Sequence, residues 1–185
     1  ISSPQPISVY QKPIHTISFS TASNTKEPRE LPKLDLWEHT EMQHGTWIHE
    51  LIAQVPFPYS EADIIRYAQQ KQYPVTKQDI ESLRMLAHDA LYETIMQLEH
   101  YHELPYMVQD KEEILHGFID FIAISKDMVY ILDFKTDRME QPDQFINMYQ
   151  QQLKTYTHAI QLLYPNHTIR SYIYSLHLHQ MIPIH

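Results

Sequence analysis

Asp120, Asp133 and Lys135 are the residues of this chain whose types and spacing could do chemistry together. Each aspartate stands beside an apolar run, where a charge without a partner destabilises the fold. Facing carboxylates repel unless a cation offsets them, and oxygen ligands of this kind suit Mg²⁺ or Mn²⁺. The lysine adds a point charge suited to a phosphate or a developing oxyanion. The alternative is a pair of surface aspartates, one of them neutralised by the lysine.

A β-hairpin is the element that would bring these residues together. Apolar runs rich in β-forming residues stand on both sides of the polar loop 125–128. If Ile124 pairs with Val129, counting back along both strands places Asp120 opposite Asp133. Side chains alternate along a strand, so the lysine shares the face of the two aspartates. The predicted strands are Ile119–Ile124 and Val129–Phe134.

The other predicted elements follow from caps, prolines and the spacing of apolar residues. The spacing predicts three helices in the first half of the chain: one from Gly45 to before Pro56, one with Ser60 as N-cap and Asp63 at the capping-box position, and a long one capped by Thr76 and Asp79 that carries apolar residues as far as Leu98. It also predicts a strand over Leu104–Val108 before the hairpin. After the hairpin it predicts a helix from Pro142 to before Pro165, a strand over Thr168–Leu178, and a segment Met181–Ile184 that pairs back onto that strand. This order predicts a mixed α/β layer arrangement.

Composition limits the class of protein. The chain has 185 residues, 43% of them hydrophobic, which fits one globular domain with or without an arm. No apolar run approaches the roughly 20 residues of a membrane span, and no secretory signal is visible. The absence of cysteine excludes disulfides, thiolate metal sites and iron–sulfur clusters. We expect a cytoplasmic protein, and Ile1 in place of methionine suggests a fragment of a longer chain.

Charge and glycine content limit the function. The net charge of −9 argues against a self-sufficient nucleic-acid binder, although bound metal or other domains would weaken this objection. Gly45 and Gly117 are the only glycines, so the chain has no Walker A loop or dinucleotide-binding fingerprint and encodes no ATPase. We expect each glycine to lie where a Cβ cannot be accommodated or where the backbone must approach something closely.

Several motifs resemble those of a known nuclease family. They are Gly45-Thr46-Trp47-Ile48-His49-Glu50-Leu51, Gly117-Phe118-Ile119-Asp120, Asp133-Phe134-Lys135-Thr136-Asp137, and Tyr149-Gln150-Gln151-Gln152-Leu153 followed by Tyr156. The first resembles the family's helix motif GTxxHxxL, and the others resemble the PD-(D/E)xK nuclease domain of the RecB family. Order and spacing over residues 45–184 are most similar to the C-terminal nuclease domain of AddA (RexA) subunits of bacterial helicase–nucleases.

The resemblance implies a fold and a domain boundary. The fold would be a restriction-endonuclease-like PD-(D/E)xK core, an α/β structure with a central mixed sheet and flanking helices. Residues 1–43 would form an extended arm or linker, and residues 44–185 the nuclease domain.

The resemblance also implies roles for the residues near the hairpin. Asp120 and Asp133 would bind a divalent metal together with the backbone carbonyl of Phe134. Lys135 would orient or activate the attacking water and stabilise charge on the phosphate. His49 would be a further metal ligand, although a lone histidine on a helix is more often structural.

Two further positions have roles with open alternatives. Glu103 would hold the metal through water, and a solvated charge at a helix end is nearly as good an interpretation. Gln152 and Tyr156 share a helix face. The family resemblance implies that Gln152 is a catalytic-site residue touching the substrate backbone, whereas the alternative is an exposed glutamine beside a core tyrosine. Tyr149 is a third candidate for substrate binding.

Together these features imply a Mg²⁺-dependent deoxyribonuclease, with Mn²⁺ as a plausible substitute, that acts as an exonuclease in double-strand break repair. Its partners would be single-stranded DNA from unwound duplex, a partner protein of the AddB (RexB) type, and upstream helicase domains, which alone would use ATP. No iron–sulfur cluster is expected. The alternatives are a catalytically weak domain of the same fold that binds DNA or a partner, and a stand-alone RecB-like nuclease.

Overall fold

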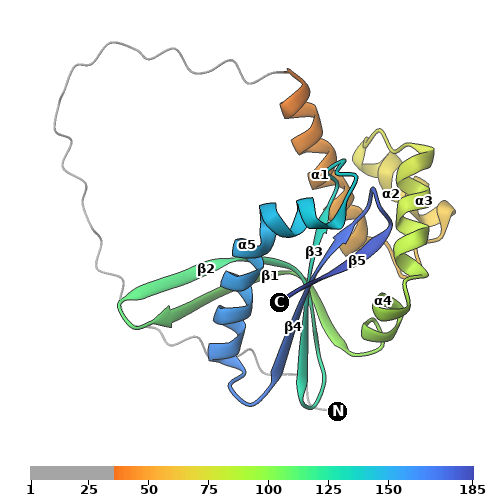
Figure 1. Ribbon diagram of the computed structural model, residues 1–185. Coiled ribbons are helices and arrows are strands. Elements are labelled where there is room, and N and C mark those ends of the chain that lie inside the picture. The colour runs from red at the N-terminus through yellow and green to blue at the C-terminus, as the bar shows by residue number, and fades with distance from the viewer. Residues whose placement is uncertain (1–35) are drawn as a thin grey trace, which may run out of the picture. The chain divides into compact units, whose positions relative to one another are not determined.

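The computed structural model describes residues 36–185, so most of the predicted arm lies outside the described residues. A five-stranded mixed sheet is the centre of the fold, with the strands in the order β1-β2-β3-β4-β5 (Figure 1). The β3–β4 pair is parallel and the other three pairs are antiparallel. The strands are β1 (Glu99–Asp110), β2 (Glu113–Ile124), β3 (Met128–Lys135), β4 (Thr168–Ser175) and β5 (Gln180–Ile184).

Helices cover both faces of this sheet. They are α1 (Leu36–Gln54), α2 (Glu61–Lys71), α3 (Lys77–Ala87), α4 (Ala90–Ile95) and α5 (Pro142–Leu163). Alternation along β3 sends Leu132 into the core shared with α1–α4 and Ile131 into the core shared with α5. The α5 helix also makes the crossover that a parallel β3–β4 pair requires. The predicted α/β class with a central mixed sheet and flanking helices is confirmed.

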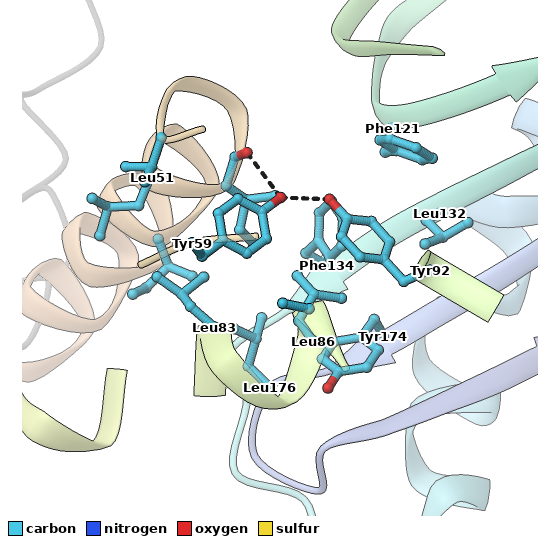
Figure 2. Packing of buried hydrophobic residues seen from close by; sticks show 14 of the residues in the cluster. Leu51, Tyr59, Leu83, Leu86, Tyr92, Phe121, Leu132, Phe134, Tyr174 and Leu176 are labelled. Carbon is cyan, nitrogen blue, oxygen red and sulfur yellow. Dashed lines mark hydrogen bonds between the residues drawn. The ribbon is translucent and has the colours of Figure 1, made fainter. Parts of the chain in front are cut away.

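Aromatic rings fill the core between the sheet and helices α1–α4. Tyr59 and Tyr92 are almost fully buried, and their hydroxyls share a hydrogen bond of 2.6 Å (Figure 2). The Tyr59 hydroxyl also donates to the carbonyl of Ile52 at 3.2 Å. Phe134 of β3 packs edge-on against Tyr92, with ring centres 6.1 Å apart. These contacts hold the C-terminal end of β3 against α1.

The hairpin predicted from the sequence is confirmed. The β2–β3 ladder runs from the Ile124–Val129 pair to the Phe121–Leu132 pair, as the sequence register requires. The helix from Pro142 and the return strand after β4 are also present.

Five predicted boundaries were wrong. The strand predicted to begin at Ile119 begins six residues earlier, since β2 starts at Glu113. The predicted long helix is broken, because Asp89 caps a new helix by accepting hydrogen bonds from the backbone N–H groups of Leu91 and Tyr92, each at 3.0 Å. The first helix begins at Leu36, well before Gly45. The strand predicted over Leu104–Val108 is longer, since β1 pairs with β2 along nearly all of its length. The strand predicted to reach Leu178 ends at Ser175, where a turn leads into β5.

No helix within residues 36–185 combines the length and apolar character that a membrane span requires.

Candidate active site

The site forms where the β2–β3 ladder ends. One residue beyond the last ladder pair, the Asp120 side chain, and not the backbone of β2, makes the hydrogen bond to β3. Its Oδ2 accepts a hydrogen bond of 2.9 Å from the N–H of Phe134. This bond holds one carboxylate oxygen of β2 against the end of β3, beside the start of the Asp133-Phe134-Lys135 motif.

His49, Glu103 and Asp120 form the first group of site residues. Their ligand atoms all lie within 4.8 Å of one another, although they come from α1, β1 and β2. His49 Nδ1 lies 3.4 Å from Asp120 Oδ2 and 3.9 Å from Glu103 Oε1. His49 Nε2 lies 2.8 Å from the carbonyl oxygen of Phe134. When Nε2 donates to this carbonyl, the lone pair of Nδ1 is left on the side of the two carboxylates.

The electrostatics of this first group favour a cation. Burial works against a charged His49, but Asp120, Asp133 and the Phe134 carbonyl outweigh it and raise the pKa of this imidazole. Burial and the nearby Asp120 carboxylate raise the pKa of Glu103, against the opposing effect of His49. Carboxylates beside one another in a half-buried setting are the environment in which bound positive charge stabilises the fold.

Asp133, Lys135 and Gln152 form the second group. Asp133 is 1% exposed, and its Oδ2 makes an ion pair of 2.7 Å with Lys135 Nζ. Burial, and then the charge of Asp120, raise the pKa of Asp133 to about 6 even though Lys135 opposes them. Lys135 Nζ donates to Gln152 Oε1, and Gln152 Nε2 donates to Asp133 Oδ1, each at 3.4 Å. The glutamine therefore bridges the two ends of the ion pair.

Two tyrosines of α5 complete the second group. The Tyr156 hydroxyl accepts a 2.6 Å hydrogen bond from Gln152 Nε2, and burial raises the pKa of this tyrosine to about 12. Lys135 Nζ lies 4.3 Å from the centre of the Tyr149 ring, a cation–π contact. Burial, with help from Asp137, raises the pKa of Tyr149. The Tyr149 ring thus borders Lys135, and Tyr156 borders Gln152.

The two glycines lie where an added Cβ would be tighter than an ordinary van der Waals contact. A Cβ on Gly45 of α1 would come within 3.3 Å of Thr136 Oγ1, just after β3. This close approach brings His49, one turn further along α1, to the carbonyl of Phe134. A Cβ on Gly117 would come within 3.0 Å of the Tyr106 ring. Both glycines thus lie where the backbone approaches a neighbouring side chain closely, as expected.

The structure gathers the sequence-predicted residues into these two adjoining groups. Asp133 is not in the close cluster with His49, Glu103 and Asp120, because its carboxylate is turned toward Lys135. Sequence reasoning gave no role to His102, which lies next to Glu103 on β1 and whose pKa is affected by the charge of Asp120. Extending the strand alternation back to Glu99 would have placed its side chain inside the fold.

A protein-family model, the PD-(D/E)XK nuclease superfamily, matches residues 27–181. The chain belongs to this superfamily. Among its relatives are proteins named as subunits of ATP-dependent helicase/nucleases. The one from Lactiplantibacillus plantarum is 31% identical over 38% of this chain and 6% of the relative. Those from Streptococcus uberis and Streptococcus pyogenes are 23% and 24% identical, over 94% and 88% of this chain and 16% and 14% of the relatives.

The chain thus spans at most 16% of the length of these three relatives. A solved structure, protein VC1899 from Vibrio cholerae, aligns with 77% of this chain and 36% of its own at a TM-score of 0.32 and 10% identity. The similarity to the nuclease regions of AddA-type helicase/nucleases, predicted from the motifs, is confirmed.

PD-(D/E)XK nucleases generally depend on a divalent metal, and the residues of this chain fit one. His49, Glu103 and Asp120 offer one imidazole and two carboxylates within a small radius, with the Asp133 carboxylate next to them. Oxygen-rich ligands of this kind suit Mg²⁺, and an added imidazole suits Mn²⁺ as well.

Proposed function

We propose that this chain is a metal-dependent deoxyribonuclease domain that hydrolyses phosphodiester bonds. The observation that carries the proposal is the buried Asp133–Lys135 ion pair beside the His49–Glu103–Asp120 group. A buried charge pair costs stability compared with apolar side chains. Its presence beside a carboxylate cluster therefore favours a chemical role.

Each residue has a part in the proposed mechanism. The metal would be held by His49, Asp120, Asp133 and the Phe134 carbonyl, with Glu103 in contact directly or through water. A bound divalent ion supplies an activated water and neutralises charge on the scissile phosphate.

Residues of β3 and α5 would act on the substrate side of the site. Lys135 would orient the attacking water and stabilise the developing charge, because its ammonium is fixed by both Asp133 and Gln152. Gln152 is engaged on three sides, so we assign it first to positioning Lys135 and only then to contact with the substrate backbone. Tyr149 and Tyr156 would border the bound strand.

The relatives named as helicase/nuclease subunits give this activity a setting. We propose that the chain works as an exonuclease at double-strand breaks, in the cytoplasm, on single strands delivered by helicase domains of the same protein and with an AddB-type partner. Residues 44–185 would be the nuclease domain, with α1 continuing back to Leu36. The net charge of −9 also favours a domain that relies on partners to hold DNA, so a catalytically weak binding domain is the second candidate.

The test is cleavage of labelled single-stranded DNA by the purified chain with Mg²⁺, Mn²⁺ or EDTA. We expect Asp133→Asn and Lys135→Ala to lower kcat about 100-fold or more, because each removes a group aligned with the transition state. The matched controls are Asp127→Asn and Lys126→Ala, in the exposed loop of the same hairpin. Activity that survives EDTA, or an Asp133→Asn variant as active as wild type, would exclude this function.

A further inference from the structure

The β1–β2 hairpin has an exposed apolar face. Met107 is 71% exposed, Ile114 61% and Phe118 62%, although side chains of this size are usually covered. The opposite face of the same hairpin is buried, since Tyr106 packs edge-on against Tyr156 of α5. This part of β2 has no pairing with β3, because that ladder starts only at Phe121 (Figure 1).

The exposed apolar side chains lie on alternate rungs of the β1–β2 ladder. The register pairs residues of β1 and β2 whose side chains point to the same face. We call these six residues the hairpin platform: Pro105 opposite Phe118, Met107 opposite His116, and Gln109 opposite Ile114. None of them is acidic, in a chain whose net charge is −9.

The hairpin platform is continuous with the candidate active site. Asp120 follows Phe118 by two residues on β2, and Glu103 precedes Pro105 by two residues on β1, so both carboxylates stand next to the platform along the same two strands. Residues two apart along a strand are separated by roughly 7 Å. A base attached next to a phosphate at Asp120 would therefore lie within reach of the Phe118 ring.

Charge decides which part of a nucleic acid such a surface can hold. A strongly acidic chain is a poor match for many phosphate contacts, whereas stacking of bases on aromatic and apolar side chains needs no positive charge. Bases are free to stack only when they are unpaired.

We propose that the hairpin platform stacks the unpaired bases of single-stranded DNA, with Phe118 holding the base next to the scissile phosphate. This inference rests on the proposed nuclease function, since it assigns the strand at the platform as the substrate. It makes Phe118 a substrate-binding residue and makes the site selective for single strands over duplex.

The first test measures binding without cleavage. A fluorescently labelled thymidine oligonucleotide is titrated with the chain in EDTA, and its anisotropy gives a Kd. We expect Phe118→Ala to weaken binding about tenfold, the usual effect of removing one stacked ring, and Phe118→Trp to retain or tighten it. Met107→Ala should weaken binding less. Met85→Ala is the matched control, because this exposed methionine lies on α3, away from the platform, and should leave Kd unchanged.

The second test uses a substrate without bases. An oligonucleotide with abasic sites should bind wild type about tenfold more weakly than the normal strand, and Phe118→Ala should bind the two alike. Wild type that binds both oligonucleotides equally or neither of them, or Phe118→Ala that binds as wild type does, overturns the proposal. The binding test needs no metal, so it is independent of cleavage. A wild-type chain that binds DNA through stacking but does not cleave it with Mg²⁺ or Mn²⁺ would refute the nuclease function and not the platform.

Discussion

The two site aspartates lie where burial alone disfavours a charged carboxylate. Asp133 is almost fully buried, yet it is paired with Lys135 at 2.7 Å and bridged to it by Gln152. A carboxylate whose pKa rises to about 6 even next to an ammonium carries a charge that burial disfavours and that a bound cation would stabilise. The nearby Asp120 is held instead by a backbone N–H. The two aspartates thus have different environments and can have different roles.

His102 gives a prediction about pH. Burial, and then the charge of His100, lower the pKa of His102 to about 4, although Asp120 opposes the shift. Its Nδ1 is buried without a hydrogen-bond partner in residues 36–185. The folded state therefore binds fewer protons at this residue than the unfolded state does. Stability from neutral His102 is complete above pH about 6.5 and is lost as the pH falls toward 4.

We expect the free energy of unfolding of wild type to fall by about 2 kcal/mol more between pH 7 and pH 4.5 than that of His102→Phe. Phenylalanine keeps the edge-on contact with Phe121, whose ring centre is 5.0 Å away, and cannot be protonated. Urea denaturation at the two pH values measures the difference. His88→Gln, at an exposed position, serves as the control. Parallel pH profiles for wild type and His102→Phe would contradict the assignment.

At the scale of elements, α1 and α3 are joined through a helix cap. Thr76 and Asp79 form the reciprocal capping box that the sequence predicts, with the Thr76 N–H donating to Asp79 Oδ2 at 2.8 Å and the Asp79 N–H donating to Thr76 Oγ1 at 3.2 Å. Asp79 Oδ1 also lies 2.8 Å from His44 Nε2 of α1. One carboxylate thus caps α3 and ties it to the helix that carries His49.

We expect Asp79→Ala to lower the free energy of unfolding by about 2 kcal/mol, since it removes both a cap and a half-buried contact between helices. Asp63 is the matched control. It stands at the same capping position of α2, but is partly exposed and bonds only within its own helix end, to Ser60 and Arg66. Asp63→Ala should cost less than about 1 kcal/mol. Chemical denaturation of both variants checks this, and equal losses would show that the link to α1 contributes nothing.

Elements defined by local signals could be predicted from the sequence, and those defined by distant contacts could not. The β2–β3 hairpin follows from its own loop and apolar runs, and its predicted register holds from the Ile124–Val129 pair to the Phe121–Leu132 pair, one step before the two aspartates. The break at Asp89 was missed because apolar spacing continues through it, even though aspartate is a good N-cap. The meeting of His49 with Glu103 depends on how α1 packs on the sheet, which no local pattern encodes; only resemblance to the family indicated it.

At the scale of the whole molecule, the carboxylate cluster is a cost that a bound ion would offset. The chain carries a net charge of −9, and Glu103, Asp120 and Asp133 add to the repulsion inside one small region. A ligand that binds only the folded state stabilises it by mass action, by about 2.7 kcal/mol at 100 times its Kd. Metal binding should therefore be visible as thermal stability of the whole domain, independently of catalysis.

We expect saturating Mn²⁺ or Mg²⁺ to raise the Tm of the wild-type chain by about 5–10 °C, since each kcal/mol shifts the Tm of a domain of this size by about 2–4 °C. Asp120→Asn should start from an equal or higher Tm in EDTA, because one repelling charge is gone, and should gain little from either metal. Asp127→Asn, which removes a charge from the exposed loop 125–128, should respond as wild type does. Differential scanning fluorimetry at constant ionic strength separates the specific effect from charge screening. The same gain in Asp120→Asn as in wild type would place the ion elsewhere in the protein.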